Sequence, residues 1–434
     1  MNRHTLREWD YLPVGENADR GEIPRRVADG LVAAARASGV GGPDGETVLV
    51  NGHARLRAGQ VVGVLVTPAA TLEILPKIDG LDEGATRRQL VHMLARVFDL
   101  DIAGGDLTGL GWQKHDLLEI LIRMFCDRLF SAVHRGLPRR YVQHQDDLPA
   151  LRGRLDAQRQ FTVLAASPWK LACRYDELSA DIPLNRIMKA AVLKLLAVAR
   201  SPENQRRLSE LALVFVDVRT TPVSALPWNE VVLDRTNAVW ASLLGLARLL
   251  LGERFQTTSL GDGQGFSLLF EMNTLFEEYT GRTLRAALQG SGLDVRLQGP
   301  RDHALLSEDN VPRFATRPDI VITDSTGPRL IIDTKWKRLR GALEDPKCGV
   351  GQADVYQMMA YAQVYRCDRL MLLYPHHGHS GGPAGILTTH HIRGTEDARL
   401  SVATLSLSKL SGVRDRLRQL VMDSVPLLEP STRQ

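Results

Sequence analysis

The stretch at residues 317–337, RPDIVITDSTGPRLIIDTKWK, constrains the fold of this chain more than any other. Two short runs rich in β-branched residues, at 320–322 and 330–332, flank the turn-forming sequence DSTGP. This arrangement predicts a β-hairpin. Asp319 opens the first strand and Asp333 closes the second, where we expect an exposed strand end.

The acidic and basic side chains of this hairpin suggest chemistry. Side chains alternate between the faces of a strand, so Asp333 and Lys335 should lie on one side. Metal-dependent phosphodiester hydrolysis needs carboxylates that hold a hard cation and a positive group that orients water or offsets charge. With Asp319, these residues supply both, although solvated Asp and Lys side chains at strand ends are an alternative explanation. The spacing, PD and then D-x-K fourteen positions later, resembles the PD-(D/E)xK nuclease superfamily.

The segment before the hairpin, residues 266–288, has the apolar spacing of a helix. The apolar positions are Leu268, Met272, Leu275, Phe276 and Tyr279. In the superfamily, a helix at this place often brings a further carboxylate to the metal, and the resemblance points to Glu277. An exposed helix glutamate is the alternative.

The segment after the hairpin predicts a helix with Asp354, Gln357 and Tyr361 on one face, at positions i, i+3 and i+7. It resembles the QxxxY helix of a subset of these nucleases, in which Gln and Tyr support the active site and the DNA. Tyr361 as a core aromatic residue with a satisfied hydroxyl is the alternative.

Four segments in order carry a wider resemblance. They are GQVVGVLVTPAATLEILPKI (59–78), CRYDELSADIPLNRIMK (173–189), LFEEY (275–279) and DVYQMMAYA (354–362). Together they are similar to the McrC family, the nuclease subunits of McrBC modification-dependent restriction systems. The match runs from about residue 50 to residue 374. Ordered motifs are more specific than one motif alone.

The resemblance implies a role for each candidate residue. Asp319 and Asp333 would hold Mg²⁺, with Mn²⁺ as a substitute, and Lys335 would orient the water and stabilise developing charge. Further metal ligands would be Glu277 and the carbonyl of Thr334, and the side chains that brace the site would be Gln357 and Tyr361.

The resemblance also implies partners. A hexameric McrB-type AAA+ GTPase would bind this subunit, recognise methylated DNA and translocate, and its GTP hydrolysis would be stimulated here. The glycine-rich sequence GDGQG at 261–265 lacks a following GK[ST], and the chain has no Walker motif. GTP should therefore be used by the partner and not bound by this chain. Two rivals are a stand-alone PD-(D/E)xK nuclease of DNA repair or recombination, and a non-catalytic scaffold that activates a GTPase.

The length of 434 residues predicts two or three domains. We expect a multidomain α+β protein with a β-rich N-terminal module (1–105), a helical middle domain (106–258) and a C-terminal restriction-endonuclease-like domain (259–434). The β-rich module, around 61–78, should contact the motor. A fragment from His115 onward should keep a folded nuclease domain.

The net charge of +4 permits DNA binding without requiring it, so a DNA-binding surface must come from local clustering. The arginine-rich segment 135–159 is the candidate, with a solvated basic loop as the alternative. Glu73 and Lys77 could pair or contact a partner, but the favoured interpretation is a solvated strand edge.

Four dispersed cysteines without a CxxC pair argue against a zinc site and a disulfide framework. The chain lacks both a signal-peptide pattern and an apolar run of membrane-spanning length. We therefore expect a soluble, cytoplasmic protein with no membrane partner.

Overall fold

The computed structural model describes residues 2–17, 21–40, 48–100, 115–235, 237–252, 266–339, 349–378, 382–395, 397–409 and 411–425. It is a mixed α+β structure with several sheets. Its residues form two compact units, Met1–Leu118 with Gly252–Gln434, and Glu119–Leu251. The two ends of the chain thus share one unit, whereas the sequence suggested separate domains. The expected boundaries near 105 and 259 lie outside the described residues.

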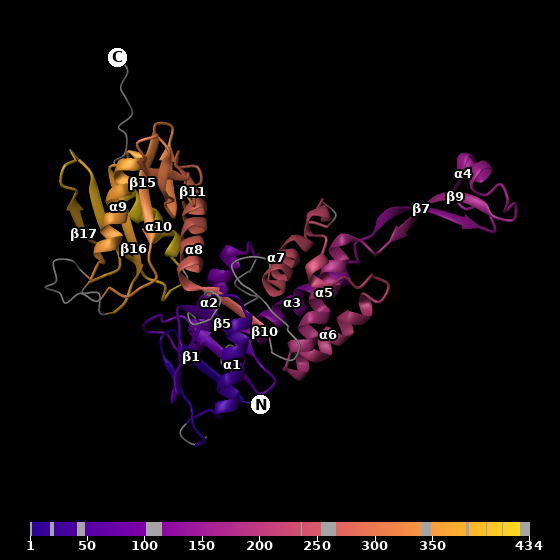
Figure 1. Ribbon diagram of the computed structural model, residues 1–434, viewed down its shortest axis with the longest axis horizontal. Coiled ribbons are helices and arrows are strands. Elements are labelled where there is room, and N and C mark those ends of the chain that lie inside the picture. Colours follow the sequence, from indigo (N-terminus) through magenta and orange to yellow (C-terminus); the bar gives the residue numbers. More distant parts are fainter. Residues whose placement is uncertain are drawn as a thin grey trace, which may run out of the picture. The chain divides into compact units, whose positions relative to one another are not determined.

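A sheet of the N-terminal region explains why the two ends belong together. Its strands, in spatial order, are β1 (Asn2–Arg7), β6 (Ala70–Leu75), β5 (Val61–Val66) and β10 (Phe266–Glu271) (Figure 1). The last of these comes from the segment that was expected to be helical. That expectation is wrong for 266–271, because β10 pairs antiparallel with β5 and the helix begins only at Met272.

The pairing of β5 with β10 is close. Gly63 has a φ of +133°, and a Cβ there would lie 1.9 Å from the carbonyl oxygen of Leu268. Leu269 of β10 is buried in the same core as β5, β6 and α1 (Arg25–Ala37). A small sheet of β2 (Tyr11–Pro13), β4 (Arg55–Ala58) and β3 (Leu49–Asn51) completes this N-terminal region.

A buried ion pair in this region corrects the solvated-edge interpretation. Glu73 is fully buried, and the Arg87 guanidinium of α2 (Glu83–Val97) donates to its carboxylate at 2.7–3.0 Å. The backbone N–H of Leu117 also donates to Glu73, at 2.9 Å. Lys77 pairs with Asp10 at 2.9 Å. Glu73 therefore stabilises the interior and is not available to a partner.

A second sheet holds the hairpin predicted from the sequence. In spatial order its strands are β11 (Asp294–Leu297), β14 (Ile320–Asp324), β15 (Gly327–Thr334), β16 (Arg369–Pro375), β18 (Arg399–Leu405) and β17 (Ile386–His391). The strands β14 and β15 are the antiparallel hairpin, and β15, β16 and β18 run parallel. A separate hairpin of β12 (Asp302–Leu306) and β13 (Pro312–Thr316) precedes β14.

Helices cover this sheet (Figure 1). Met358 and Tyr361 of α9 (Gln352–Tyr365) pack with Ile331 of β15 in one core. Helix α8 (Met272–Ala287) packs against β11 and β15 and also against α10 (Val413–Ser424). Because side chains alternate along β15, residues 331 and 333 share the face that α9 covers.

The second unit is helical at its base, with an arm built of strands. The helices are α3 (Leu117–His134), α5 (Pro183–Val198), α6 (Pro202–Val214) and α7 (Trp240–Leu251), of which α3 begins in the first unit. The arm consists of β7 (Arg140–Leu148), β9 (Leu171–Ser179), β8 (Arg154–Leu155) and α4 (Ala157–Thr162). The expected middle domain is therefore not purely helical. Among the described residues, no helix has the length and apolar character needed to cross a membrane.

The β5–β10 pairing changes the expected result of truncation. A fragment that begins at His115 lacks β5, so it exposes Phe266, Leu268, Leu269 and Phe270, which are buried in the full chain. At about 2 kcal/mol per apolar side chain, the loss approaches a typical domain stability of about 5–15 kcal/mol. We expect the fragment to lose the part of the thermal transition, measured by circular dichroism, that belongs to the region from Phe266 onward, while the separate unit Glu119–Leu251 still unfolds cooperatively. A transition with the full chain's amplitude per residue and within a few degrees of its Tm would contradict this.

Candidate active site

The register of the β14–β15 hairpin brings two carboxylates together. Ile320 pairs with Ile332, so Asp319 faces Asp333 across the open end of the hairpin. The backbone N–H and the hydroxyl of Thr334 both donate to Oδ2 of Asp319, at 2.8 and 2.9 Å. These hydrogen bonds fix the Asp319 side chain beside the end of β15.

Asp333 is fully buried, which corrects the expectation of an exposed strand end. The Lys335 ammonium lies 2.6 Å from Oδ2 of Asp333, and the Lys335 side chain is 24% exposed. Asp333 of β15 and Lys335, one residue beyond the end of that strand, thus lie on one side, as the alternation predicts. A buried carboxylate beside a cation that still reaches solvent is the charge arrangement expected of a catalytic site.

Helix α9 braces this pair through Gln357. The Gln357 amide donates to Oδ1 of Asp333 at 3.2 Å, and its oxygen accepts from the Lys335 ammonium at 3.2 Å. The same amide nitrogen donates to the Tyr361 hydroxyl at 2.6 Å. Tyr361 in turn donates to the backbone oxygen of Arg317 at 3.2 Å. Tyr361 is therefore both a buried core aromatic and part of the network around Asp333.

Glu277 of α8 lies near the other acids but is held by another residue. Gln298 donates to its Oε1 at 2.6 Å. Burial, then the charge of Asp319, raises the pKa of Glu277 to about 7. In the part of the chain that the structure describes, no three His, Cys, Asp or Glu side chains are arranged to hold one metal ion.

The pKa values of the two aspartates and of Lys335 are all raised from their usual values. Burial, then the neighbouring Asp319, raises the pKa of Asp333 to about 6. Burial also raises the pKa of Asp319. For Lys335, burial lowers the pKa, but the Asp333 carboxylate more than compensates and the net pKa is raised, so the ammonium stays protonated.

The donor set fits a small hard cation. The buried carboxylate of Asp333, the partly buried carboxylate of Asp319 and a backbone carbonyl at Thr334 offer oxygen atoms. Mg²⁺ commonly takes one or two protein carboxylates and keeps several waters. Such an ion would offset the cost of ionising Asp319 and Asp333, whose pKa values are raised by burial and, for Asp333, also by the charge of Asp319. The site therefore does not require Glu277 as a direct ligand.

Two polar residues at the site escaped sequence reasoning. Gln298, which holds Glu277, has a φ of +53°, and its backbone N–H donates to the backbone oxygen of Asp319 at 2.6 Å. Asn273 accepts a hydrogen bond from the backbone N–H of Trp336 at 3.1 Å. Neither belongs to a recognisable motif, because each acts through a contact between segments distant in sequence.

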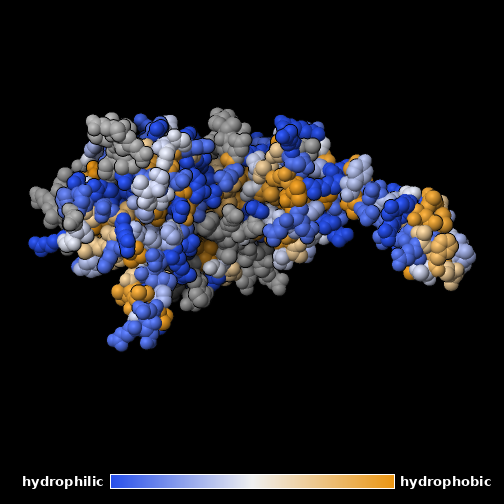
Figure 2. Space-filling view, turned by 90° about the horizontal axis from the view of Figure 1, so that it is seen from above, coloured by the Kyte–Doolittle hydropathy of each residue, from blue (hydrophilic) through white to orange (hydrophobic). Residues whose placement is uncertain are grey.

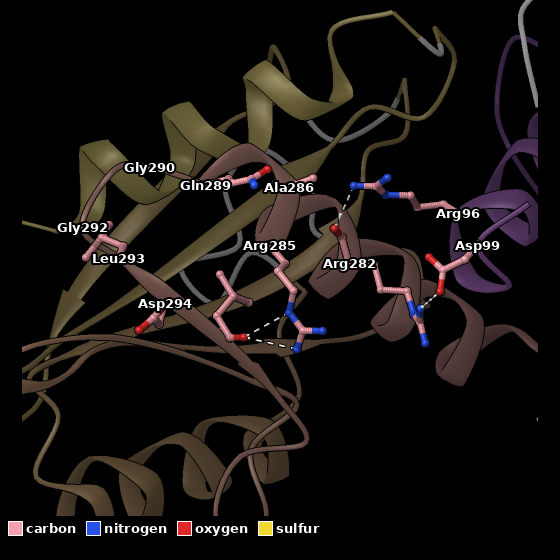
Figure 3. Close-up of a pocket in the computed structure, with 11 residues that line it drawn as sticks. Arg96, Asp99, Arg282, Arg285, Ala286, Gln289, Gly290, Gly292, Leu293 and Asp294 are labelled. Atoms are coloured by element: carbon pink, nitrogen blue, oxygen red, sulfur yellow. Dashed lines mark hydrogen bonds and ion pairs between the residues drawn. The ribbon is translucent and has the colours of Figure 1, made fainter. Parts of the chain in front are cut away.

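A hollow of about 650 Å³ beside α8 contains three arginines but is not the candidate site (Figure 3). Arg96 donates to the backbone oxygen of Arg282 at 3.0 Å, and Arg282 pairs with Asp99 at 2.9 Å. Arg285 donates to the backbone oxygen of Val295 at 3.3 Å. These contacts tie the end of α8 to its neighbours, so they account for the arginines without a ligand.

Comparison with known proteins identifies relatives of the whole arrangement. The sequence model of the family described as "McrBC 5-methylcytosine restriction system component" matches residues 56–375. A search of curated proteins gave no match.

Two solved structures from Thermococcus gammatolerans resemble the fold. A chain of a refined half-complex from a tetradecameric assembly of McrB AAA+ hexamers with bound McrC has a TM-score of 0.74 and 19% identity, over 97% of this chain and 100% of that one. A chain of the cryo-EM structure of the McrBC complex has a TM-score of 0.51 and 24% identity, over 66% of this chain and 88% of that one. At these identities the likeness concerns the fold alone.

The raised pKa values predict how Mg²⁺ should affect stability. A carboxyl with a raised pKa in the folded chain stabilises the fold at low pH, and this contribution disappears as pH rises through about 6 for Asp333. Mg²⁺ binds the ionised carboxylate. We expect millimolar Mg²⁺ to raise the Tm more at about pH 8 than at about pH 5, as measured by scanning fluorimetry.

The double variant Asp319→Asn/Asp333→Asn is the control for this measurement. It should show no Mg²⁺-dependent shift of Tm at either pH. An equal shift in the variant and the unmodified chain would mean that the ion binds elsewhere.

Proposed function

This chain belongs to the McrBC 5-methylcytosine restriction system components, and from this premise we propose that it is the DNA endonuclease subunit of such a system. It would cleave methylcytosine-containing DNA by Mg²⁺-dependent phosphodiester hydrolysis. The observation that carries the proposal is the convergence of Asp319, Asp333 and Lys335, with Gln357 bridging the last two.

The order of elements around the site supports a PD-(D/E)xK nuclease domain. Helix α8, the β14–β15 hairpin, α9 and the parallel strand β16 follow one another in the chain. The hairpin contributes both aspartates, and α9 contributes the Gln and Tyr of the QxxxY pattern. We infer that this part of the chain is the catalytic domain.

Each side chain of the site has a role in the proposed reaction. A bound Mg²⁺ would offset charge on the phosphodiester and lower the pKa of water. Asp319 and Asp333 would hold the ion, with the carbonyl of Thr334 as a further ligand. The Lys335 ammonium would donate to the attacking water or a phosphate oxygen and stabilise the developing negative charge.

The supporting residues keep these groups in place. Gln357 contacts both Asp333 and Lys335, so it limits the rotation of the two reacting side chains. Tyr361 holds Gln357 and has its own pKa raised to about 12, chiefly by burial, so it stays a neutral hydrogen-bonding group. Glu277 would not bind the ion directly. Burial, then the charge of Asp319, raises its pKa to about 7, so its ionisation would depend on the charge of the site.

A McrB-type AAA+ GTPase is the proposed partner. One resembling structure contains McrB AAA+ hexamers with bound McrC. We propose that this chain binds such a hexamer and stimulates its GTP hydrolysis, while GTP itself is bound by the partner.

The surface of that contact has to be revised from the sequence-based expectation. Strands β5 and β6, at the centre of segment 61–78, are buried along their whole length. They therefore build the core of the N-terminal region and offer no side chains to a motor.

The arm of the second unit is the better candidate. Exposed apolar side chains cluster in its sequence, and Figure 2 shows hydrophobic residues gathered at its end. The most exposed are Phe161 at 77%, Tyr141 at 74%, Trp169 at 68% and Val163 at 67%. Large exposed apolar groups of this kind mark interaction sites.

The arginines of the arm favour a protein partner over DNA. Arg159 pairs with Asp147 at 3.0 Å, and Arg152 pairs with Glu177 at 3.5 Å. Their charges are thus partly offset within the arm. The proposal that segment 135–159 follows a phosphate backbone is weakened accordingly.

The two rival functions are less well supported. A non-catalytic scaffold does not require Asp319, Asp333 and Lys335 to lie together at the end of the hairpin. A stand-alone nuclease has no reason to carry an arm with exposed aromatic residues.

Removal of the buried carboxylate tests the nuclease assignment. In Asp333→Asn, cleavage of methylated plasmid DNA by the assembled complex should fall about 100-fold or more. Its Tm at about pH 7.5 should not fall, because the cost of ionising a buried acid is gone. Asp324→Asn, at the turn of the same hairpin, should cleave normally. Cleavage by Asp333→Asn within about twofold of the unmodified chain would disprove the assignment.

The exposed aromatic residues test the partner surface. The double variant Phe161→Ser/Trp169→Ser should lose most of the stimulation of the partner GTPase, about 10-fold or more, while its Tm is unchanged because both side chains are exposed. Leu213→Ser on α6, at a site 74% exposed, is the matched control and should stimulate normally. Full stimulation by the double variant would place the contact elsewhere.

A further inference from the structure

Trp336 follows Lys335 directly, and three of its polar atoms are held by distant segments of the same unit. Its backbone N–H donates to Oδ1 of Asn273 at 3.1 Å. Its backbone oxygen accepts from Nε2 of Gln60 at 2.5 Å. Its indole Nε1 donates to Oε2 of Glu8 at 2.8 Å. Both the backbone and the ring of Trp336 are therefore fixed.

These holding residues also contact one another or the surrounding fold. Gln60 Nε2 donates to Oδ1 of Asn273 at 3.2 Å, and the backbone N–H of Lys77 donates to Oε2 of Glu8 at 3.1 Å. The Trp336 ring packs edge-on against Phe276 of α8, with centroids 5.3 Å apart. The cluster thus links the strand ends of the N-terminal sheet to the peptide after Lys335.

The burial of Glu8 is costly for a purely structural group. Its side chain is fully buried, and its Oε1 makes no hydrogen bond. Burying a carboxylate with one unsatisfied oxygen destabilises a fold unless something else is gained. What this carboxylate does hold is the indole of the residue next to Lys335.

We propose that Glu8 and Gln60 are positioning residues for Lys335 and act through Trp336, an inference that rests on the proposed nuclease function. The Lys335 side chain is a flexible stem of four carbons, so the position of its ammonium depends on the backbone to which it is attached. On the N-terminal side of the Lys335 side chain, the backbone is fixed by the hydrogen bond from Lys335 N–H to the backbone oxygen of Leu373, at 2.9 Å. On its C-terminal side, the backbone is fixed by the contacts of Trp336.

This proposal makes the N-terminal region a part of the catalytic unit. Loss of either contact should leave the fold and the DNA affinity intact. It should lower the rate of the catalytic step, because a displacement of about 1 Å at a catalytic group can cost about 100-fold in rate. The N-terminal region would then serve cleavage directly, in addition to covering β10.

The test compares four variants of the full chain, each assembled with its partner GTPase. Glu8→Ala and Gln60→Ala remove the contacts to Trp336, and Glu8→Gln keeps an acceptor oxygen for the indole. Ser38→Ala is the control, since Ser38 is a buried hydrogen-bonding residue of the same region whose contacts, with Ala35 and Val40, are remote in sequence from Trp336. Methylated plasmid cleavage gives kcat and KM.

We expect Glu8→Ala and Gln60→Ala to lower kcat about 10-fold to 100-fold with KM unchanged. Glu8→Gln should recover most of kcat, and Ser38→Ala should match the unmodified chain. Gln60 is only partly buried, so its variant remains informative if Glu8→Ala fails to fold.

A second readout needs neither metal nor activity. The full chain labelled with 5-fluorotryptophan gives a ¹⁹F signal for Trp336, assigned by its absence in Trp336→Phe. The signal should move in Glu8→Ala and return in Glu8→Gln. If it moves while kcat is unchanged, or if Ser38→Ala loses as much kcat as Glu8→Ala, the positioning role is wrong. Normal cleavage by Lys335→Ala would instead overturn the proposed function.

Discussion

The pairing of Ile320 with Ile332 is the constraint on which the candidate site depends. In this register Asp319 and Asp333 face one another at the open end of the hairpin, and Lys335 follows on the face of Asp333. A slip of β15 by one residue would turn each of its side chains to the opposite face, and would separate Asp333 from Gln357. The apolar residues that pack under α8 and α9 therefore set the register that the chemistry requires.

The same register has an electrostatic cost. A buried and a partly buried carboxylate lie beside one ammonium. Burial raises the pKa of both, and the charge of Asp319 raises that of Asp333 further. A divalent cation would offset this cost, which gives a physical reason for a metal at this place. The residues that surround the pair come from α8, α9 and, through Trp336, from the N-terminal sheet. The region of the candidate site is consequently linked by hydrogen bonds to the first residues of the chain.

Local sequence patterns predicted the hairpin, the helix that carries Gln357 and Tyr361, and the position of Asp333 and Lys335 on the same side of the strand. The family resemblance is confirmed by the match to residues 56–375. Contacts between segments distant in sequence could not be predicted, because no local pattern encodes them. The apolar spacing at 266–271 suits a helix, but β5 recruits those residues as a strand. The burial of Asp333 and of Glu73 also depends on partners far away in sequence. Glu8 and Gln298 belong to no motif, and only the folded chain brings them near the site.

The position of a bound Mn²⁺ ion tests the central claim most directly, because Mn²⁺ can replace Mg²⁺ at oxygen-rich sites and scatters X-rays anomalously. Crystals of the full chain soaked in Mn²⁺ should give an anomalous peak between the carboxylates of Asp319 and Asp333, next to the carbonyl of Thr334. The peak should be absent in Asp333→Asn. An ion found elsewhere in the chain, with none at the hairpin, would contradict the claim that this hairpin is a metal-dependent nuclease centre.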